Sequence, residues 1–130
     1  MYILYYQVIY NFNGFKIGFL SISKNFIKLQ SNSNINVLSK NDNYQKTLKQ
    51  IRDFRNNNNL DFLILCIHWG IEYDLSYNNI QKETAKSFIE NGVNIVLGHH
   101  PHVLQNMDII KTNTRVGYVF YSLGNFLFDS

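Results

Sequence analysis

A sequence of 130 residues with 45% hydrophobic and 15% aromatic content is long enough for a domain with its own core, and it excludes a disordered tail. The 12 Lys and Arg residues against 9 Asp and Glu give a formal charge of +3 that is spread along the chain, so nothing indicates a nucleic-acid-binding surface. No apolar run approaches the ~20 residues of a membrane span, and the first residues lack the basic region and cleavage site of a signal peptide, so localisation stays open.

The first part of the chain predicts a hairpin followed by a helix. Residues 2–10 and 15–21 are rich in β-forming side chains and flank a turn-like segment, 11–14. The polar residues 24–43 predict a loop. A helix is then indicated, because Asp42 is a suitable capping residue and apolar side chains follow it at helical spacing, before a run of asparagines ends the pattern. These side chains are Tyr44, Leu48, Ile51 and Phe54.

The middle of the chain predicts a strand, a helix and a second strand. Residues 61–68 form a continuous apolar run, typical of a strand buried on both faces, and the single Cys66 within it is expected to be a small buried hydrophobe. A helix is predicted over 79–90, with Gly92 as its stop signal and 93–97 as the next buried strand. Such a βαβ unit places its two strands parallel and side by side. The helix is expected to bury Ile80, Thr84, Phe88 and Ile89.

The end of the chain predicts a closing hairpin. Residues 103–110 and 115–122 have strand character and flank a turn at 111–114. Neither an internal repeat nor an interdomain linker is visible in the sequence. The predicted fold class is therefore α/β, with residues 1–130 in one domain that contains a βαβ unit and flanking hairpins.

Three of the four histidines fall in the segment GHHPH, residues 98–102, directly after the second buried strand. His68 ends the first buried strand, and the carboxyl ends of parallel strands meet at the edge of a sheet where ligands bind. In an extended segment residues two apart point the same way, so His100 and His102 are expected to face one point while His99 faces elsewhere. Pro101 favours this geometry, because the residue before a proline is held extended.

Three imidazoles at one sheet edge are suitable ligands for a divalent transition metal such as Zn, Mn or Fe. Gly98 is expected to let the backbone approach this site closely. The competing interpretation is that a histidine at a strand end is an ordinary polar residue, and short HxH motifs also occur by accident. The convergence of two separate strand ends favours the metal site.

Four further residues have a functional and a structural interpretation. Glu72 and Asp74 follow His68 closely, and each is either a residue that orients an imidazole or acts as a general base, or a solvated loop acid. Trp69 either lines a pocket or packs in the core. Asn125 either reaches the metal rim or stabilises a turn. No GxSxG, P-loop, GxGxxG or CxxC motif is present, so these enzyme classes lack support.

Three segments resemble the C-terminal half of the CapA family of capsule and poly-γ-glutamate biosynthesis proteins. They are IHWGIEY (67–73), VLGHHPHVLQ (96–105) and YSLGNFLFD (121–129), in the family's order and spacing. A fourth segment, NGFKIGFLSIS (13–23), resembles the family's hairpin ahead of this half. The resemblance implies a calcineurin-like metallophosphoesterase fold, an α/β/β/α sandwich of two sheets. It also implies a role in making, exporting or anchoring an anionic polymer at the cell surface, and the family is usually membrane-associated or extracytoplasmic.

The resemblance implies metal-ligand roles for His68, His100 and His102, with Glu72 or Asp74 as supporting residues. In an intact relative, two divalent ions are expected to polarise a substrate oxygen and supply a hydroxide for attack on a phosphate-like or polymer substrate. The family's Gly-Asp and Asn-His motifs of the N-terminal half are absent from this sequence. Three histidines without those ligands make at most half of a two-metal site.

The missing motifs predict that this chain is a fragment, a split gene product or a truncated reading frame. It is expected to be inactive or nearly so when alone, with one sheet edge and one core face uncovered. Its partner is then an N-terminal half encoded upstream. Two alternatives stay open. The chain is either a non-catalytic assembly subunit that needs a partner supplying the missing half, or a degenerate metal-binding module.

Overall fold

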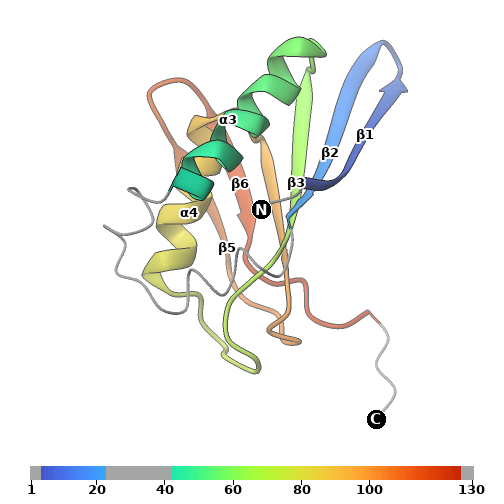
Figure 1. The fold of residues 1–130 in the computed structure, drawn as a ribbon. Helices are drawn as coiled ribbons and strands as arrows, with labels where there is room; N and C mark the ends of the chain where they lie inside the picture. The colour runs from blue at the N-terminus through green and yellow to red at the C-terminus, as the bar shows by residue number, and fades with distance from the viewer. Residues whose placement is uncertain (1–3, 23–41, 127–130) are drawn as a thin grey trace.

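A computed structural model describes residues 4–22 and 42–126, and these form a mixed α/β structure with a six-stranded sheet and two helices (Figure 1). The loop predicted at 24–43 lies outside the described residues up to residue 41, and its last two residues already belong to the first helix. The elements are β1 (Leu4–Phe12), β2 (Phe15–Ile22), α3 (Asp42–Asn57), β3 (Phe62–His68), α4 (Asn79–Glu90), β4 (Ile95–His99), β5 (Met107–Lys111) and β6 (Val116–Phe120).

The strand order in the sheet is β1-β2-β3-β4-β6-β5. The four inner strands run parallel, and the two edge strands, β1 and β5, pair antiparallel with their hairpin partners. The opening hairpin, the βαβ unit β3-α4-β4 and the closing hairpin are therefore all confirmed. The sequence did not indicate the order of the last two strands in the sheet. After β4 the chain forms the edge strand β5 first, and β6 then fills the position between β4 and β5.

Helix α4 begins and ends at the predicted residues, and its capping interactions explain why. The side chain of Asn78 accepts from the backbone N–H of Gln81 at 2.9 Å, and the Gln81 side chain accepts from the backbone N–H of Asn78 at 2.9 Å. This capping box satisfies two helix donors at once. It also directs Gln81 inward, so Gln81 is buried and Ile80, which was expected on the buried side, is only half-buried.

Strand β4 begins two residues later than predicted, because the end of α4 uses the residues between. Gly92 has φ +122°, and its N–H donates to the carbonyl of Ile89 while the N–H of Val93 donates to the carbonyl of Phe88. This pair of bonds is a Schellman motif. Asn94 then accepts from the backbone N–H of Leu63 through its side chain at 2.9 Å, so ladder pairing starts at Ile95.

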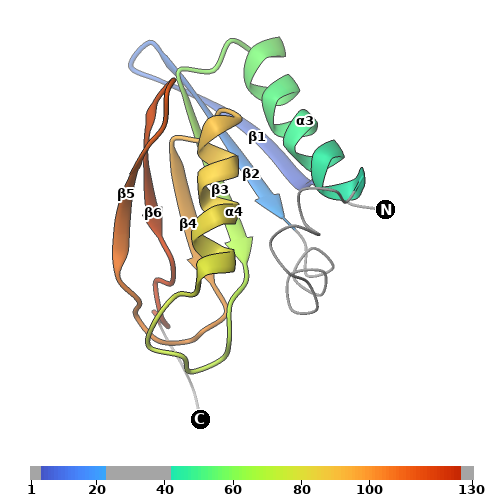
Figure 2. The same ribbon diagram turned by 90° about the vertical axis from the view of Figure 1, so that its left-hand side faces the viewer.

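Both helices lie on the same face of the sheet (Figure 2). The predicted stripe of α3 is buried there, as are the alternate side chains of β3 that point the same way. These residues, with others from β2, α4, β4 and β6, form one hydrophobic core. The buried side chains of α3 and β3 in this core are Tyr44, Leu48, Ile51, Phe54, Leu63, Leu65 and Ile67. Neither helix is long and apolar enough to cross a membrane.

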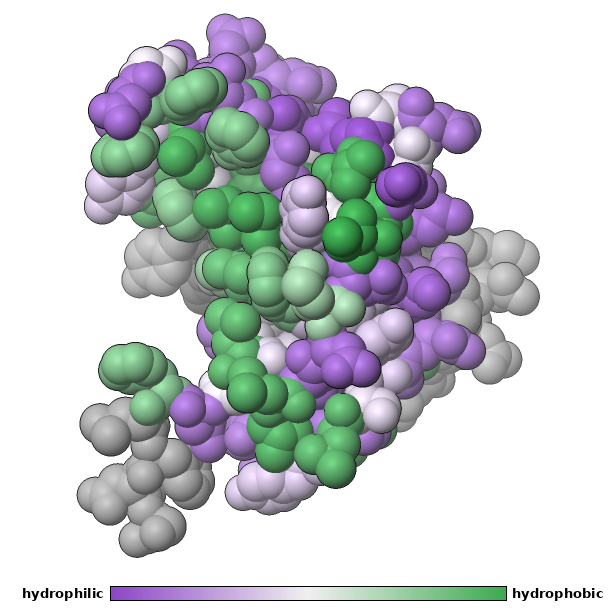
Figure 3. Space-filling model, turned by 180° about the vertical axis from the view of Figure 1, so that it is seen from behind, coloured by the Kyte–Doolittle hydropathy of each residue, from purple (hydrophilic) through white to green (hydrophobic). Residues whose placement is uncertain are grey.

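The opposite face of the sheet, called the open face below, is also apolar. One row of side chains crosses all six strands in register, and it contains no charged residue. The row is Val8, Phe19, Ile64, Ile95, Tyr118 and Ile109. Seen from behind, the molecule carries a broad band of hydrophobic surface (Figure 3). Among the described residues, no helix packs on this face.

Candidate functional site

The predicted rim forms where β3 and β4 end side by side. His68 is the last residue of β3, and it pairs with His99, the last residue of β4, in the parallel ladder. The chain turns directly after His99, and the backbone N–H of Trp69 donates to the His99 carbonyl at 3.0 Å. The GHHPH segment is therefore held next to the end of β3.

Three histidine rings meet at this rim. The ring centroids of His68 and His100 are 4.3 Å apart, and those of His100 and His102 are 6.0 Å apart. The side-chain oxygen of Asn125, Oδ1, lies 2.8 Å from Nδ1 of His102, so this asparagine does reach the rim. His99 is exposed at the end of β4. The structure thus brings together the three predicted ligands and Asn125.

The backbone that presents these rings is not extended, so that part of the prediction is wrong. His100 has φ +109° and His102 has φ +62°, both in a region that favours glycine. The chain must reverse here, and the reversal is held because the N–H of Tyr73 donates to the carbonyl of Pro101 at 2.8 Å and the N–H of Leu123 donates to that of Gly98 at 3.2 Å. Strain of this kind is found at functional sites.

The strained backbone predicts an unusual order of stability for two substitutions at His100. Because a side chain at φ +109° costs roughly 1–3 kcal/mol, His100→Gly is expected to be more stable than His100→Ala by about 1 kcal/mol. Urea denaturation of both variants measures this difference. At His99, which lies in a regular strand, the order is expected to reverse. If the Gly variant is more stable than the Ala variant at both positions, or less stable at both, the backbone at His100 is not strained.

Trp69 and Gly98 belong to the core behind the rim. The Trp69 side chain is fully buried, its Nε1–H donates to the carbonyl of Tyr121 at 2.8 Å, and its ring stacks on that of Tyr121. A Cβ atom at Gly98 would lie 2.0 Å from the same carbonyl oxygen and 2.4 Å from Trp69 Nε1. The close approach at Gly98 thus serves the packing of Trp69 against the segment after β6, and the structural interpretation of Trp69 is the one observed.

The two predicted carboxylates lie in the loop after His68. Glu72 is exposed, and Oδ1 of Asp74 accepts from the backbone N–H of Ser76 at 3.1 Å, which closes a local turn. The Asp74 carbonyl also accepts from the side chain of Gln105 at 2.8 Å, which ties this loop to the segment that follows GHHPH. Their proposed roles as general base or orienting residue stay predictions.

Sequence reasoning passed over Tyr73. Its ring centroid lies 6.3 Å from that of His102, its side chain is exposed, and its backbone has φ +62°. An aromatic ring beside the rim can bound a substrate pocket. The signal available in the sequence was its place between the two acidic residues that follow His68.

The donor set fits a divalent transition metal in its chemistry, because imidazole is a ligand for Zn, Fe and related ions. The arrangement of the rings is not that of a preformed site. The His68 and His100 rings meet at an interplanar angle of 42°, and within residues 4–22 and 42–126 no three His, Cys, Asp or Glu side chains are placed to hold one ion. Metal binding at this rim therefore requires the rings to rotate from the positions seen here.

The environment of Cys66 disfavours a reactive thiol. Cys66 lies on the open face in the middle of β3, and burial raises the pKa of its thiol, which disfavours the reactive thiolate. Cys66 is only half-buried, so the prediction that this strand is buried on both faces is wrong: among the described residues, one face of β3 is buried and the other is partly exposed.

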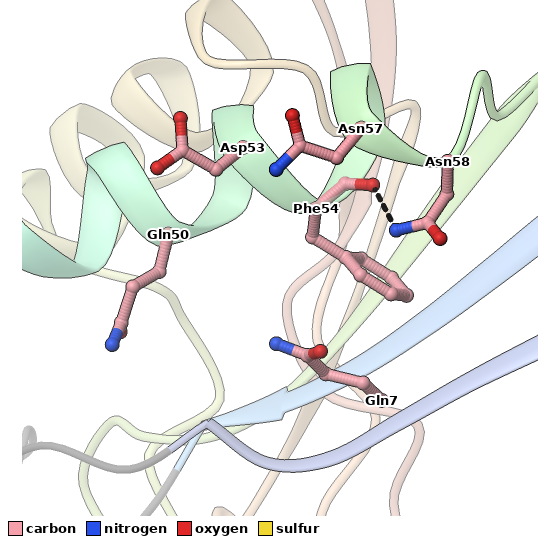
Figure 4. Close-up of a pocket in the computed structure, with 6 residues that line it drawn as sticks. All are labelled: Gln7, Gln50, Asp53, Phe54, Asn57 and Asn58. Atoms are coloured by element: carbon pink, nitrogen blue, oxygen red, sulfur yellow. Dashed lines mark hydrogen bonds between the residues drawn. The ribbon is translucent and has the colours of Figure 1, made fainter.

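A surface pocket of about 220 Å³ lies between α3 and β1, remote in sequence from the rim residues (Figure 4). Its lining is mainly amide side chains, and its single carboxylate, Asp53, pairs with Lys49. At the end of α3, the side chain of Asn58 donates to the carbonyl of Phe54 at 2.9 Å. None of the candidate site residues lines this pocket. The lining residues are Gln7, Gln50, Asp53, Phe54, Asn57 and Asn58.

Comparison with known proteins gives a consistent assignment. Residues 5–130 match the family model described as bacterial capsule synthesis protein PGA_cap. The chain is 36% identical over 121 residues to the capsule biosynthesis protein CapA of Bacillus anthracis, covering 92% of this chain and 28% of that protein. It is 41% identical over 69 residues to the PGA biosynthesis protein CapA of Bacillus subtilis (strain 168), covering 53% of this chain and 17% of that protein. The chain thus spans less than a third of the length of these relatives, and it belongs to the CapA family of capsule biosynthesis proteins.

Proposed function

We propose that this chain supplies the histidine side of a metal-dependent, hydrolase-like site that serves the synthesis, export or anchoring of an anionic surface polymer. The observation that carries the proposal is the contact of His68 with His100 across the ends of two parallel strands, with His102 beside them. The names of the two CapA relatives, which refer to capsule and PGA biosynthesis, indicate the polymer.

The residues at the rim have different proposed roles. His68, His100 and His102 offer ring nitrogens to a divalent ion, whose chemical contribution when bound is to polarise a substrate oxygen as a Lewis acid. Tyr73 and the loop that carries Glu72 bound one side of the rim. The remaining ligands expected from the family resemblance come from polypeptide outside this sequence, so the chain alone is expected to be inactive.

The test is made in a bacterium whose surface polymer depends on this chain together with the polypeptide that supplies the remaining ligands. His100→Ala is expected to abolish or strongly reduce the γ-linked glutamate polymer on the cell surface. It is measured as the glutamate in polymer that is extracted from washed cells, freed of ordinary protein by proteases that cleave α-linked chains, and then hydrolysed in acid. His99→Ala is the matched control, because it removes an exposed imidazole one residue away. Normal polymer in the His100→Ala strain, at normal protein level, would overturn the proposal.

A second candidate function is that of a non-catalytic subunit completed by a partner polypeptide. The open face favours it, because an apolar row across six strands is unusual on a free surface. The occupant we propose is a polypeptide that lays a second sheet on this face, as in a sandwich with inner faces about 10 Å apart. The greater length of the CapA relatives is consistent with such additional polypeptide.

The exposed open face predicts self-association of the isolated chain. The double variant Ile109→Lys with Tyr118→Lys places two charges on the open face, where both side chains are about half exposed. It is expected to remove oligomers seen by analytical ultracentrifugation and to lower binding of a hydrophobic dye, with unchanged circular dichroism. Gln45→Lys with Gln50→Lys, on the exposed side of α3, is the control. A parent chain that is monomeric and binds no dye would argue against a docking face.

A further inference from the structure

The segment after β6 is fixed against the GHHPH segment by several contacts. The N–H of Leu123 donates to the carbonyl of Gly98, and Leu123 forms an isolated antiparallel bridge with Leu104. Gly124 follows with φ +66°, and its N–H donates to the Ser122 hydroxyl at 3.3 Å. This turn presents the next residue, Asn125, to the rim.

Asn125 meets one nitrogen of His102. The distance from Asn125 Oδ1 to His102 Nδ1 is 2.8 Å, a normal hydrogen-bond length. An amide oxygen accepts and does not donate, so in this contact Nδ1 of His102 carries the proton. The other ring nitrogen, Nε2, is then unprotonated in the neutral ring, which is the form of an imidazole nitrogen that binds a metal ion.

We propose that Asn125 is a positioning residue that selects the Nδ1–H tautomer of His102 and thereby makes Nε2 the ligand atom at the rim. The functional consequence rests on the proposed metal site, whereas the tautomer itself is a property of the metal-free chain. The same hydrogen bond holds the His102 ring in its present orientation, so the rotation that metal binding requires falls on His68 and His100.

The experiment measures the ring nitrogens of His102 directly. The chain is labelled with ¹⁵N, kept free of metal with a chelator, and examined by long-range ¹H–¹⁵N NMR. The pH is about 8.5, so that histidine rings with ordinary pKa values are neutral. In the parent chain His102 is expected as the Nδ1–H tautomer. In Asn125→Ala it is expected to revert to the Nε2–H tautomer that free histidine favours.

Two further variants separate positioning from general structure. Asn125→Asp keeps an oxygen acceptor at the same place and is expected to retain the Nδ1–H tautomer. Asn106→Ala removes an exposed asparagine elsewhere on the surface and is expected to leave His102 unchanged. An Nε2–H tautomer in the parent chain, which the opposite orientation of the amide would produce, overturns the inference. So does an unchanged tautomer in a folded Asn125→Ala chain.

A parallel titration with Zn²⁺ keeps this inference separate from the proposed function. Asn125→Ala is expected to weaken zinc binding about tenfold, as for other residues that orient a ligating histidine. If the parent chain binds no zinc at the rim, the proposed function fails while the tautomer result still decides the role of Asn125. If zinc binds equally in both chains although the tautomer changes, the positioning role in metal binding is overturned.

Discussion

Gly98→Ala is expected to destabilise the chain by about 3 kcal/mol or more, a large share of the roughly 5–15 kcal/mol that stabilises a typical domain. The added Cβ would lie 2.0 Å from the Tyr121 carbonyl oxygen, a backbone atom, and 2.4 Å from Trp69 Nε1. Relief requires β4 and the segment after β6 to separate, which stretches the bond from the Trp69 indole to Tyr121. Urea denaturation followed by circular dichroism measures the loss.

Gly14→Ala is the matched control for this substitution. Gly14 lies in the turn between β1 and β2 at φ +83°, and no atom lies within 4 Å of the Cβ that would be added. Gly14→Ala is therefore expected to lower the free energy of unfolding only through backbone strain, by about 1 kcal/mol. Equal losses at the two glycines would show that the close packing behind the rim does not require glycine at position 98.

Removing one rim histidine is expected to have the second large effect. His100→Ala or His102→Ala should weaken binding of Zn²⁺ or Mn²⁺ to the untagged chain by about 100-fold, which corresponds to ~2.7 kcal/mol, because one of three imidazole ligands is lost. Isothermal titration calorimetry gives the affinities.

The neighbouring histidine supplies the control for the metal titration. His99→Ala changes an exposed ring at the end of β4 and is expected to leave the affinity within about twofold, the size of an ordinary surface effect. If His99→Ala weakens binding as much as His100→Ala, the ions bind to a flexible cluster of imidazoles and not to a site built from two strand ends.

Much of the fold could be predicted because its signals are local. The bounds of α4 follow from Asn78 and Gln81 at its start and Gly92 after its end. Each of these residues forms hydrogen bonds with residues only a few positions away in the sequence. The start of β4 was misplaced because Val93 and Asn94 look apolar or neutral in sequence but are used by the helix end and by the contact to Leu63. The order of β5 and β6 depends on pairing between distant strands, which no local pattern records.

The site was predicted in its location but not in its backbone. The topology alone places His68 and the GHHPH segment at one rim, and the rings of His68, His100 and His102 do meet there. The extended conformation expected before Pro101 was wrong, because hydrogen bonds from two other segments hold the reversal at His100 and His102. Contacts between such segments lie outside what the preference of one proline can indicate.

The most direct measurement is a titration of the parent chain with Zn²⁺, followed through the ring signals of its four histidines by NMR. If the rim is the ligand site, the signals of His68, His100 and His102 shift together and saturate at one equivalent of metal, while those of His99 stay in place. No shift at stoichiometric zinc, or an equal shift of all four rings, would contradict a metal site formed by these three histidines.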